Sequence, residues 1–243
     1  MHDAGKKPYV IAVANEKGGV AKTTSTLAIG TILAQKGFKI LCIDLDPQGN
    51  LTLSLGYKPQ DLPATKEPLN TETENLDLIF ARPLIVDDAY QLRVDAGQDV
   101  AALTALPYDY VLLDCPPSLG KLALDALLVA NFLIIPTQAD FFSAYSLKNM
   151  MELVGLVRRR GNPDLPYRIL VTLFDQRNSI HHSILNQLNQ VFGGGMFNTM
   201  IEVDAQLRKS AILGFPITKC RGAMQYHLLV EEMLKYIREV QMV

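Results

Sequence analysis

The chain has 243 residues, of which 49% are hydrophobic and 20% are charged, and its formal net charge is -2. This length and apolar fraction are sufficient for one substantial domain with a buried core. The near-neutral balance excludes a surface coated with positive charge. Binding to nucleic acid would therefore require a local basic patch, because phosphate contacts dominate that affinity.

The three cysteines, Cys42, Cys115 and Cys220, lie far apart in the sequence. Their odd number and the absence of a C-x-x-C pair argue against a disulfide framework or a structural zinc site. No apolar run reaches the roughly 18 residues that a membrane span needs. The polar start, residues 1–8, also lacks the apolar stretch of a secretory signal. We therefore expect a soluble cytoplasmic protein.

Apolar runs alternate with helical patterns along the chain. The runs predict strands at 9–14, 39–43, 76–80, 108–113, 132–136 and 168–174. Helices are expected at 22–36, where Gly37 suits the residue after the helix end, and at about 120–130, 144–160, 180–192 and 222–240. The segment 50–107, rich in proline and acidic residues, is otherwise expected to be loop with one or two helices.

Continuous apolar strands separated by helices are typical of a parallel sheet with both faces covered. We therefore predict an α/β fold with three layers, in which a mostly parallel central sheet carries helices on both faces. The whole chain, 1–243, is expected to form a single nucleotide-binding domain. Ligands of such sheets bind at the carboxyl ends of the strands.

The segment 17–24, K-G-G-V-A-K-T-T, lies between the first predicted strand and the first predicted helix. Small residues allow backbone N–H groups to approach phosphates, the helix N-terminus adds its dipole, and a hydroxyl can bind magnesium. The generic pattern G-x-x-x-x-G-K-[ST] is not met, because Glu16 and Ala21 occupy its two glycine positions. Alanine disfavours positive φ, so we expect a right-handed backbone at Ala21. Alone, this segment also fits an ordinary turn between a strand and a helix.

Carboxylates follow two of the predicted strands. Asp44 and Asp46 belong to the string D-L-D-P-Q-G-N after the second strand, and Asp114 ends the fourth. At the carboxyl edge of a sheet, such groups can hold a metal and a water, and a carboxylate can orient that water or take its proton. Each is alternatively a turn or strand cap.

Together these strings resemble motifs of the ParA/MinD family of ATPases. K-G-G-x-x-K-T is similar to the deviant Walker A box, D-x-D-P-Q-G-N to the Walker A′ motif of the partition branch, and D-x-P-P-S at 114–118 to its Walker B motif. Softer likenesses at 135–138, 173–175 and 214–217 extend the resemblance over nearly the whole chain, with 50–107 diverged. The resemblance implies a P-loop NTPase fold, ATP and Mg²⁺ as cofactors, and ATP hydrolysis.

The resemblance also implies a role for individual residues. Lys22 would hold the β- and γ-phosphates, Lys17 would reach across a dimer interface to the partner's nucleotide, and Asp46 would activate water. Asp44 would support that catalytic group. The implied magnesium ligands are Thr23, Asp114 and Asp46. The implied nucleotide-binding residues are Lys17, Gly18, Gly19, Val20, Ala21, Lys22, Thr23 and Thr24, with Pro216 and Arg221 near the adenine by analogy.

Three branches of the family remain open. A ParA-like protein would form an ATP-dependent homodimer, bind DNA non-specifically on the nucleoid, and meet a ParB-like or cargo-adaptor protein that stimulates hydrolysis. A MinD-like protein needs a basic amphipathic helix, whereas the last predicted helix carries Glu231, Glu232 and Glu239. An iron–sulfur relative needs two thiolates, and although Cys115 lies close to a nucleotide motif, no convincing second ligand accompanies it. A non-hydrolysing, ATP-dependent adaptor is a further alternative. We favour the first reading and expect no membrane partner.

The expected DNA surface departs from the family pattern. ParA-like proteins usually carry arginines in the stretch that corresponds to 201–207, which here is acidic. The basic residues that follow, Arg208, Lys209, Lys219 and Arg221, are the predicted DNA contacts. The triplet 158–160 either binds DNA or favourably ends a helix. Residues 181 and 182, both histidine, are expected on the surface because adjacent helical residues do not face the same way.

Overall fold

A single seven-stranded sheet organises the part of the chain that the computed structural model describes, residues 7–62, 67–80, 101–102, 106–207, 209 and 220–241. Its strand order is β3-β4-β2-β5-β1-β6-β7. The strands are β1 (Tyr9–Val13), β2 (Ile40–Asp44), β3 (Leu69–Asn70), β4 (Leu76–Phe80), β5 (Tyr110–Asp114), β6 (Phe132–Gln138) and β7 (Tyr167–Thr172). All neighbours pair in parallel except β3, which runs antiparallel to β4.

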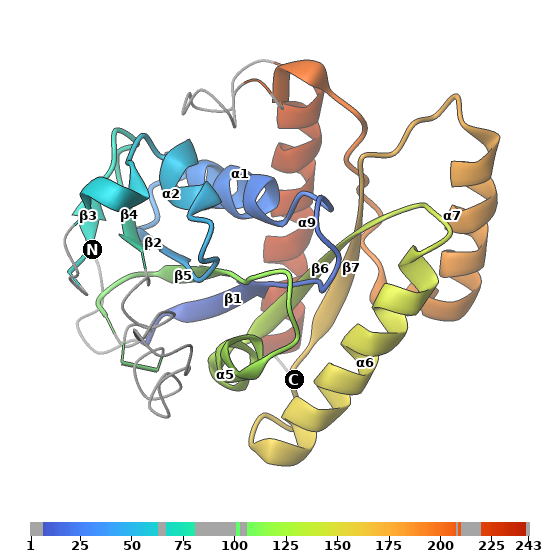
Figure 1. Ribbon diagram of the computed structural model, residues 1–243, viewed down its shortest axis with the longest axis horizontal. Coiled ribbons are helices and arrows are strands. Elements are labelled where there is room, and N and C mark those ends of the chain that lie inside the picture. The colour runs from blue at the N-terminus through green and yellow to red at the C-terminus, as the bar shows by residue number, and fades with distance from the viewer. Residues whose placement is uncertain are drawn as a thin grey trace.

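Helices cover both faces of this sheet (Figure 1). They are α1 (Lys22–Gln35), α2 (Asn50–Ser54), α5 (Lys121–Val129), α6 (Ser143–Arg160), α7 (Ser179–Phe192) and α9 (Arg221–Gln241), with short 3-10 helices at Pro59–Asp61 and Gly193–Gly195. Apolar residues of α1 and α9 share one hydrophobic cluster, and those of α5, α6 and α7 share another. Along β1 the side chains alternate between the clusters, Val10 and Ala12 in one and Ile11 and Val13 in the other, as the two-residue period of a strand requires.

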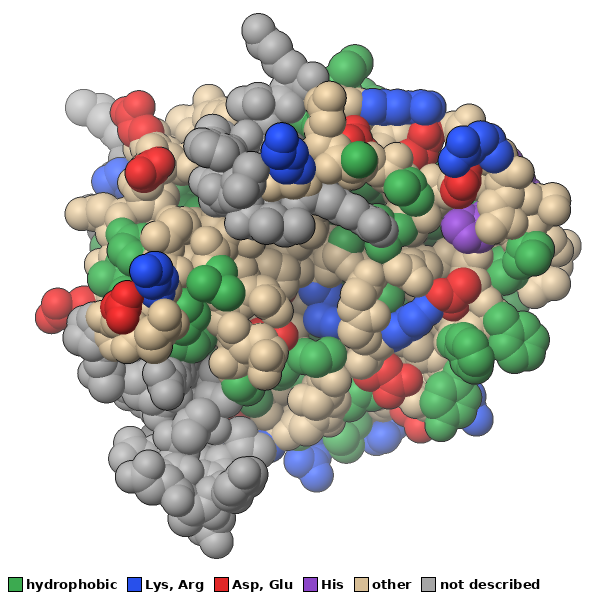
Figure 2. Space-filling model, turned by 45° about the horizontal axis from the view of Figure 1, so that its top comes forward, with side chains coloured by type: hydrophobic (Ala, Val, Ile, Leu, Met, Phe, Trp, Pro, Cys, Tyr) green, Lys and Arg blue, Asp and Glu red, His purple; other side chains and the backbone are tan. Residues whose placement is uncertain are grey.

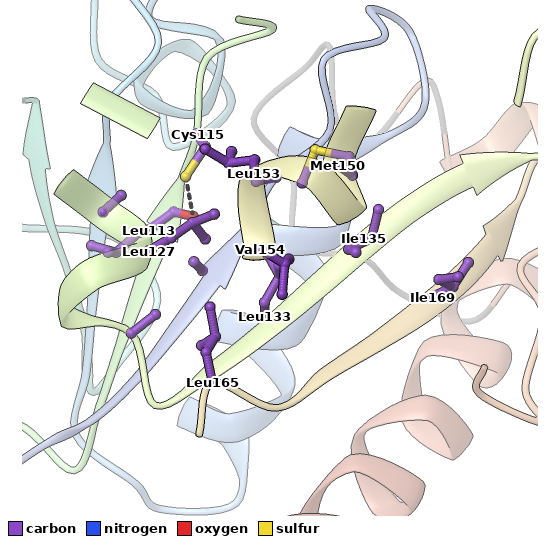
Figure 3. Close-up of a cluster of buried hydrophobic side chains, with 14 of the residues drawn as sticks. Leu113, Cys115, Leu127, Leu133, Ile135, Met150, Leu153, Val154, Leu165 and Ile169 are labelled. Atoms are coloured by element: carbon purple, nitrogen blue, oxygen red, sulfur yellow. Dashed lines mark hydrogen bonds between the residues drawn. The ribbon is translucent and has the colours of Figure 1, made fainter. Parts of the chain in front are cut away.

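The packing of α6 on β6 shows how the apolar strands hold the layers together. Val154 of α6 lies beside Leu133 of β6, and Leu153 of the same helix points towards Cys115 (Figure 3). All of these side chains are almost completely buried. Because a buried strand with apolar residues on both faces must be covered twice, the continuous apolar runs of the sequence specify the three-layer arrangement.

The predicted fold is confirmed. The helices and strands differ from the predicted ones at their ends and in the segment 50–107. Gly37 follows α1 with a φ of 89°, as expected for the residue after a helix end. The described residues of this segment include α2 and the 3-10 helix Pro59–Asp61, but also β3, which the sequence did not predict. A strand of two residues is too short to show a two-residue period. No described helix is both long enough and apolar enough to cross a bilayer.

Candidate functional site

The segment 17–24 comprises the last part of the loop between β1 and α1 and the first three residues of α1, at the carboxyl end of an inner strand of the sheet. Gly18 and Gly19 face open space: a Cβ atom added to either would meet no other group within 4 Å. Gly19 has a φ of 74°, a conformation that suits glycine. A ligand could therefore approach the exposed backbone closely at these two glycines, as a phosphate cradle requires.

Ala21 has a left-handed backbone, with φ 63° and ψ 33°, so the predicted right-handed conformation is wrong. This residue caps α1: its carbonyl accepts the first helical hydrogen bond, from the Ser25 amide at 2.9 Å. The preceding carbonyls are also held, since Gln138 donates to Gly19 at 3.0 Å and Thr172 donates to Val20 at 3.0 Å. The surrounding strands β6 and β7 therefore impose a conformation that costs an alanine about 1–2 kcal/mol.

Lys22, the first residue of α1, lies inside the loop. Its Nζ donates to the Lys17 carbonyl at 3.0 Å, and the side chain is almost completely buried. Burial lowers the pKa of this ammonium, while the carboxylates of Asp114 and Asp46 oppose that shift. The charge is held where a phosphate in the loop would meet it.

Thr23 is bonded to the carboxylate at the end of β5. Its Oγ1 donates to Asp114 Oδ2 at 2.7 Å, and Thr26 Oγ1 donates to the other oxygen at 3.3 Å. Asp114 is completely buried. Burial, and then the neighbouring carboxylate of Asp44, raise the pKa of Asp114 to about 8. A hard cation placed beside these oxygens would favour the ionised carboxylate, so the residues fit a magnesium site.

Asp44, at the end of β2, lies in register with Asp114. One of its oxygens accepts hydrogen bonds from the Thr52 amide at 2.8 Å and hydroxyl at 2.7 Å, and the other accepts from the Asp46 amide at 3.2 Å. Burial raises the pKa of Asp44 to about 6, although these hydrogen bonds oppose the shift. The side chain thus fixes α2 and the backbone of Asp46, which fits the supporting role that the resemblance implies.

Asp46 lines a cavity of about 530 Å³ in front of the phosphate loop. Its Oδ1 accepts a hydrogen bond from the Gln48 amide at 2.9 Å, which holds the carboxylate in the turn before α2. The cavity is lined by Gly18, Gly19, Ala21, Lys22, Thr23, Thr24, Asp46, Gln48, Asn50, Leu53, Ser54 and Pro117. In Figure 2, basic side chains are visible at the centre of the molecular face that is turned to the viewer. The geometry brings the phosphate loop, a carboxylate and α2 around one space.

A second cavity, of about 260 Å³, also borders the phosphate loop. It is lined by Gly19, Ala21, Thr24, Leu173, Ile201, Asp204, Leu207 and Tyr226. Sequence reasoning missed Leu173, Ile201 and Tyr226 here, because only tertiary packing brings them together. The signal that was present is the apolar residues at 201 and 207, which bracket the acidic stretch.

The acidic side chains of the stretch 201–207 form hydrogen bonds and an ion pair with other residues of the chain. The Asp204 carboxylate accepts hydrogen bonds from the amides of Gln206, Leu207 and Gly222, at 2.8, 3.2 and 2.9 Å. Glu202 pairs with Arg221 at 2.8 Å. Asp204 therefore caps the start of α9 and lines the second cavity, and Glu202 binds the first residue of that helix.

The predicted DNA contacts are only partly within the described residues. Lys209 is exposed, and Arg221 is exposed and paired with Glu202. Arg208 and Lys219 lie outside the described residues, as does Pro216, the predicted adenine contact.

The remaining motifs have structural partners. In the triplet that ends α6, Arg158 donates to the Leu165 carbonyl at 2.8 Å. His181 accepts a hydrogen bond from the Asp175 amide at 3.0 Å, and both His181 and His182 contact the Phe174 ring. Within the described ranges, no three His, Cys, Asp or Glu side chains form a metal cluster.

A mostly parallel sheet in which an inner strand runs through a glycine-containing loop into a helix beginning Lys-Thr is the architecture of the P-loop NTPases, and this chain has that fold. A family model described as an AAA domain matches residues 8–167. The chain is 32% identical to the chromosome partitioning protein ParA of Caulobacter vibrioides, with 96% of each chain covered. It is 31% identical to the sporulation initiation inhibitor protein Soj of Bacillus subtilis, with 92% of this chain and 97% of that protein covered. The chain belongs to the ParA/Soj family of partition ATPases.

Solved structures agree with the fold. Cobyrinic acid a,c-diamide synthase from Mycobacterium smegmatis with bound ADP and magnesium is similar with a TM-score of 0.77 and 29% identity, covering 95% of this chain and 96% of that one. An ATP complex of a McdA variant from Cyanothece has a TM-score of 0.80 at 20% identity, covering 94% of this chain and 97% of that one, and supports the fold alone.

The left-handed backbone of Ala21 yields a stability prediction. Ala21→Gly should raise the free energy of unfolding by about 1 kcal/mol, because glycine adopts positive φ without steric cost. Ala28→Gly, in the right-handed interior of α1, should lower it by about 1 kcal/mol or more. Chemical denaturation of the nucleotide-free protein measures both. A loss of stability in Ala21→Gly would contradict the assigned strain.

The buried carboxylate of Asp114 yields a pH-dependent prediction. Its pKa is higher in the folded chain than in the unfolded chain, so the carboxylate destabilises the fold increasingly as pH rises from about 4 to above 8. In magnesium-free buffer, Asp114→Asn should therefore be more stable than the natural chain at pH 8.5, by about 1 kcal/mol or more. The difference should shrink towards pH 5. Thermal melts at both values measure it, and a gap that grows on acidification would contradict the assignment.

Proposed function

We propose that this chain is a ParA-type switch ATPase that binds ATP and Mg²⁺ between two subunits of a homodimer. Hydrolysis is slow, is stimulated by a ParB-like or cargo-adaptor protein, and separates the dimer. The ATP-bound dimer binds DNA non-specifically on the nucleoid of the cytoplasm, and so segregates a plasmid or chromosome or positions another cargo. Relatives named as chromosome partitioning proteins, at about one-third identity over most of the chain, support this reading.

The observation that carries the proposal is the presence of two lysines with different surroundings on one phosphate loop. Lys22 is buried and directed into the loop, where it would meet the β- and γ-phosphates. Lys17 is partly exposed, at 24% of its side-chain area, and its ammonium lies outside the loop beside β6. A loop that binds its own nucleotide through Lys22 leaves Lys17 available for the nucleotide of a second subunit.

The other residues of the site have separate roles in this proposal. Thr23 and Asp114 would hold Mg²⁺, which supplies compensation for phosphate charge when bound, and Asp46 borders the same space. Asp46 would orient a water or take its proton, with its position fixed through Asp44 and the turn before α2. The bound ADP and magnesium of the Mycobacterium smegmatis relative support these cofactors.

The second cavity is the proposed binding site for the adenine base of the nucleotide. It adjoins the phosphate loop at Gly19, Ala21 and Thr24, and its wall includes the fully buried ring of Tyr226. Arg221 begins α9 beside Glu202 at the edge of this region. Together with Pro216, Arg221 stays the predicted contact on the adenine side.

The membrane alternative finds no support in α9. Of its apolar residues, Leu229, Met233 and Ile237 are buried against α1 and the sheet, whereas Leu228 and Val240 are exposed. A membrane-binding helix must have an apolar face that is free to enter the interface. The docked position of α9 therefore favours the reading without a membrane partner.

Asp46→Ala should trap the ATP-dependent dimer. Without the carboxylate, turnover should fall by about 10²-fold or more, while ATP and Mg²⁺ still bind. Phosphate release and analytical ultracentrifugation with ATP measure the two effects. Asp61→Ala, an exposed carboxylate in the nearby 3-10 helix, is the matched control and should behave as the natural chain. Normal turnover in Asp46→Ala would rule out the water-activating role.

A mobility shift on non-specific duplex DNA, with and without ATP and at several salt concentrations, tests the branch of the family. Binding should require ATP and weaken steeply with salt, because phosphate contacts release counterions. Lys209→Glu should weaken binding, and Lys235→Glu, an exposed lysine on α9, should not. Absence of any ATP-dependent shift at low salt would favour a non-hydrolysing adaptor or a relative that does not bind DNA.

A further inference from the structure

The side-chain ammonium of Lys17 forms an ion pair with a residue that is remote in the sequence. Asp140 lies between β6 and α6, and its Oδ2 forms an ion pair with Lys17 Nζ. Gln138 Oε1 lies 3.4 Å from the same nitrogen. The Gln138 amide nitrogen also donates to the Gly19 carbonyl at 3.0 Å, so this wall is attached to the phosphate loop.

The carboxylate of Asp140 is fixed in place by the first turn of α6. Its Oδ1 accepts hydrogen bonds from the Phe142 amide at 3.1 Å and from Ser143 Oγ at 3.0 Å. Burial alone would raise the pKa of Asp140, but the hydrogen bonds from Lys17 and Ser143 outweigh it and keep that pKa below its usual value. Asp140 is therefore ionised at neutral pH. Because the hydrogen bonds from Phe142 and Ser143 hold its carboxylate, Asp140 cannot follow Lys17 if the lysine side chain moves away.

The backbone beside Lys17 is anchored separately. Asn15 accepts a hydrogen bond from the Lys17 amide at 3.1 Å and is itself bonded to Ser146 of α6. Glu16 accepts a hydrogen bond from Asn149 at 2.7 Å. Because these contacts hold the backbone, breaking the pair with Asp140 would free the lysine side chain without releasing the loop.

The ion pair lies where a second molecule could approach. Phe141 and Phe142, which follow Asp140, are 84% and 69% exposed, and Tyr145 is 68% exposed. An ammonium in this position must exchange its carboxylate partner for a phosphate before it can serve another subunit.

We propose that Asp140 is a positioning residue that retains Lys17 on its own subunit until a second copy of the chain presents its nucleotide. This inference rests on the proposed function, since it assigns the state of Lys17 before dimerisation. Each ATP-dependent association would then include one exchange per subunit, in which Lys17 leaves Asp140 for a phosphate group. Removing the carboxylate should make dimerisation easier.

Asp140→Asn tests this directly, because the amide oxygen can still accept the hydrogen bonds from Phe142 and Ser143. With ATP and Mg²⁺, the dimer dissociation constant should fall by about two- to fivefold, the range expected for loss of a partly exposed pair. Asp140→Glu, which keeps a carboxylate, should return it towards the natural value, and Asp164→Asn, an exposed control, should not change it. In a Lys17→Ala background, Asp140→Asn should have no effect. An unchanged or weaker dimer in Asp140→Asn, or the same change without Lys17, would overturn the inference.

A second readout does not depend on dimerisation. In the nucleotide-free protein, the rate of Lys17 acetylation by a small reagent, followed by mass spectrometry, should rise about twofold or more in Asp140→Asn and not in Asp164→Asn. An unchanged rate would overturn the inference even if the natural chain fails to dimerise. Failure of the natural chain to dimerise with ATP would instead overturn the proposed function, so the two failures are distinguishable.

Discussion

The hydrogen bond from Thr23 to Asp114 joins the phosphate loop to the sheet, and the arrangement of the site depends on it. Thr23 lies in the first turn of α1 and Asp114 ends β5, so the bond fixes the helix N-terminus over the carboxyl edge of the strands. A completely buried carboxylate is costly unless it is paired or hydrogen-bonded. The two threonine hydroxyls supply hydrogen bonds without cancelling the charge, and this leaves a site suited to a cation.

The buried carboxylates that suit the site to a cation also make the fold less stable. Asp44 and Asp114 end neighbouring strands in register, and their mutual repulsion adds to the cost of burial. A chain selected only for a stable fold would have no reason to place two carboxylates there. Strain and buried charge of this kind are characteristic of sites whose ligand offsets the cost.

Much of the fold follows from local patterns in the sequence, and the exceptions have physical causes. Continuous apolar strands such as β2 and β6 are buried on both faces, so their composition alone identifies them. Ala21 shows the limit of local propensity, because bonds from β6 and β7 to the adjoining carbonyls override the preference of alanine for negative φ. The phosphate loop and the carboxylates were found as motifs because each is contiguous. The pair of Lys17 with Asp140 and the wall formed by Tyr226 join residues far apart in sequence, and no pattern in a single chain reveals them.

The contact between α1 and α9 bears on the order in which the molecule can be completed. Ser25 of α1 is hydrogen-bonded to the hydroxyl of Tyr226 in α9 at 2.8 Å, across 201 positions of sequence. The phosphate loop is therefore translated well before α9, the helix that packs on α1 and lines the second cavity. A nascent chain carries the loop before that cavity can form, so the two halves of this region are completed at different times during synthesis.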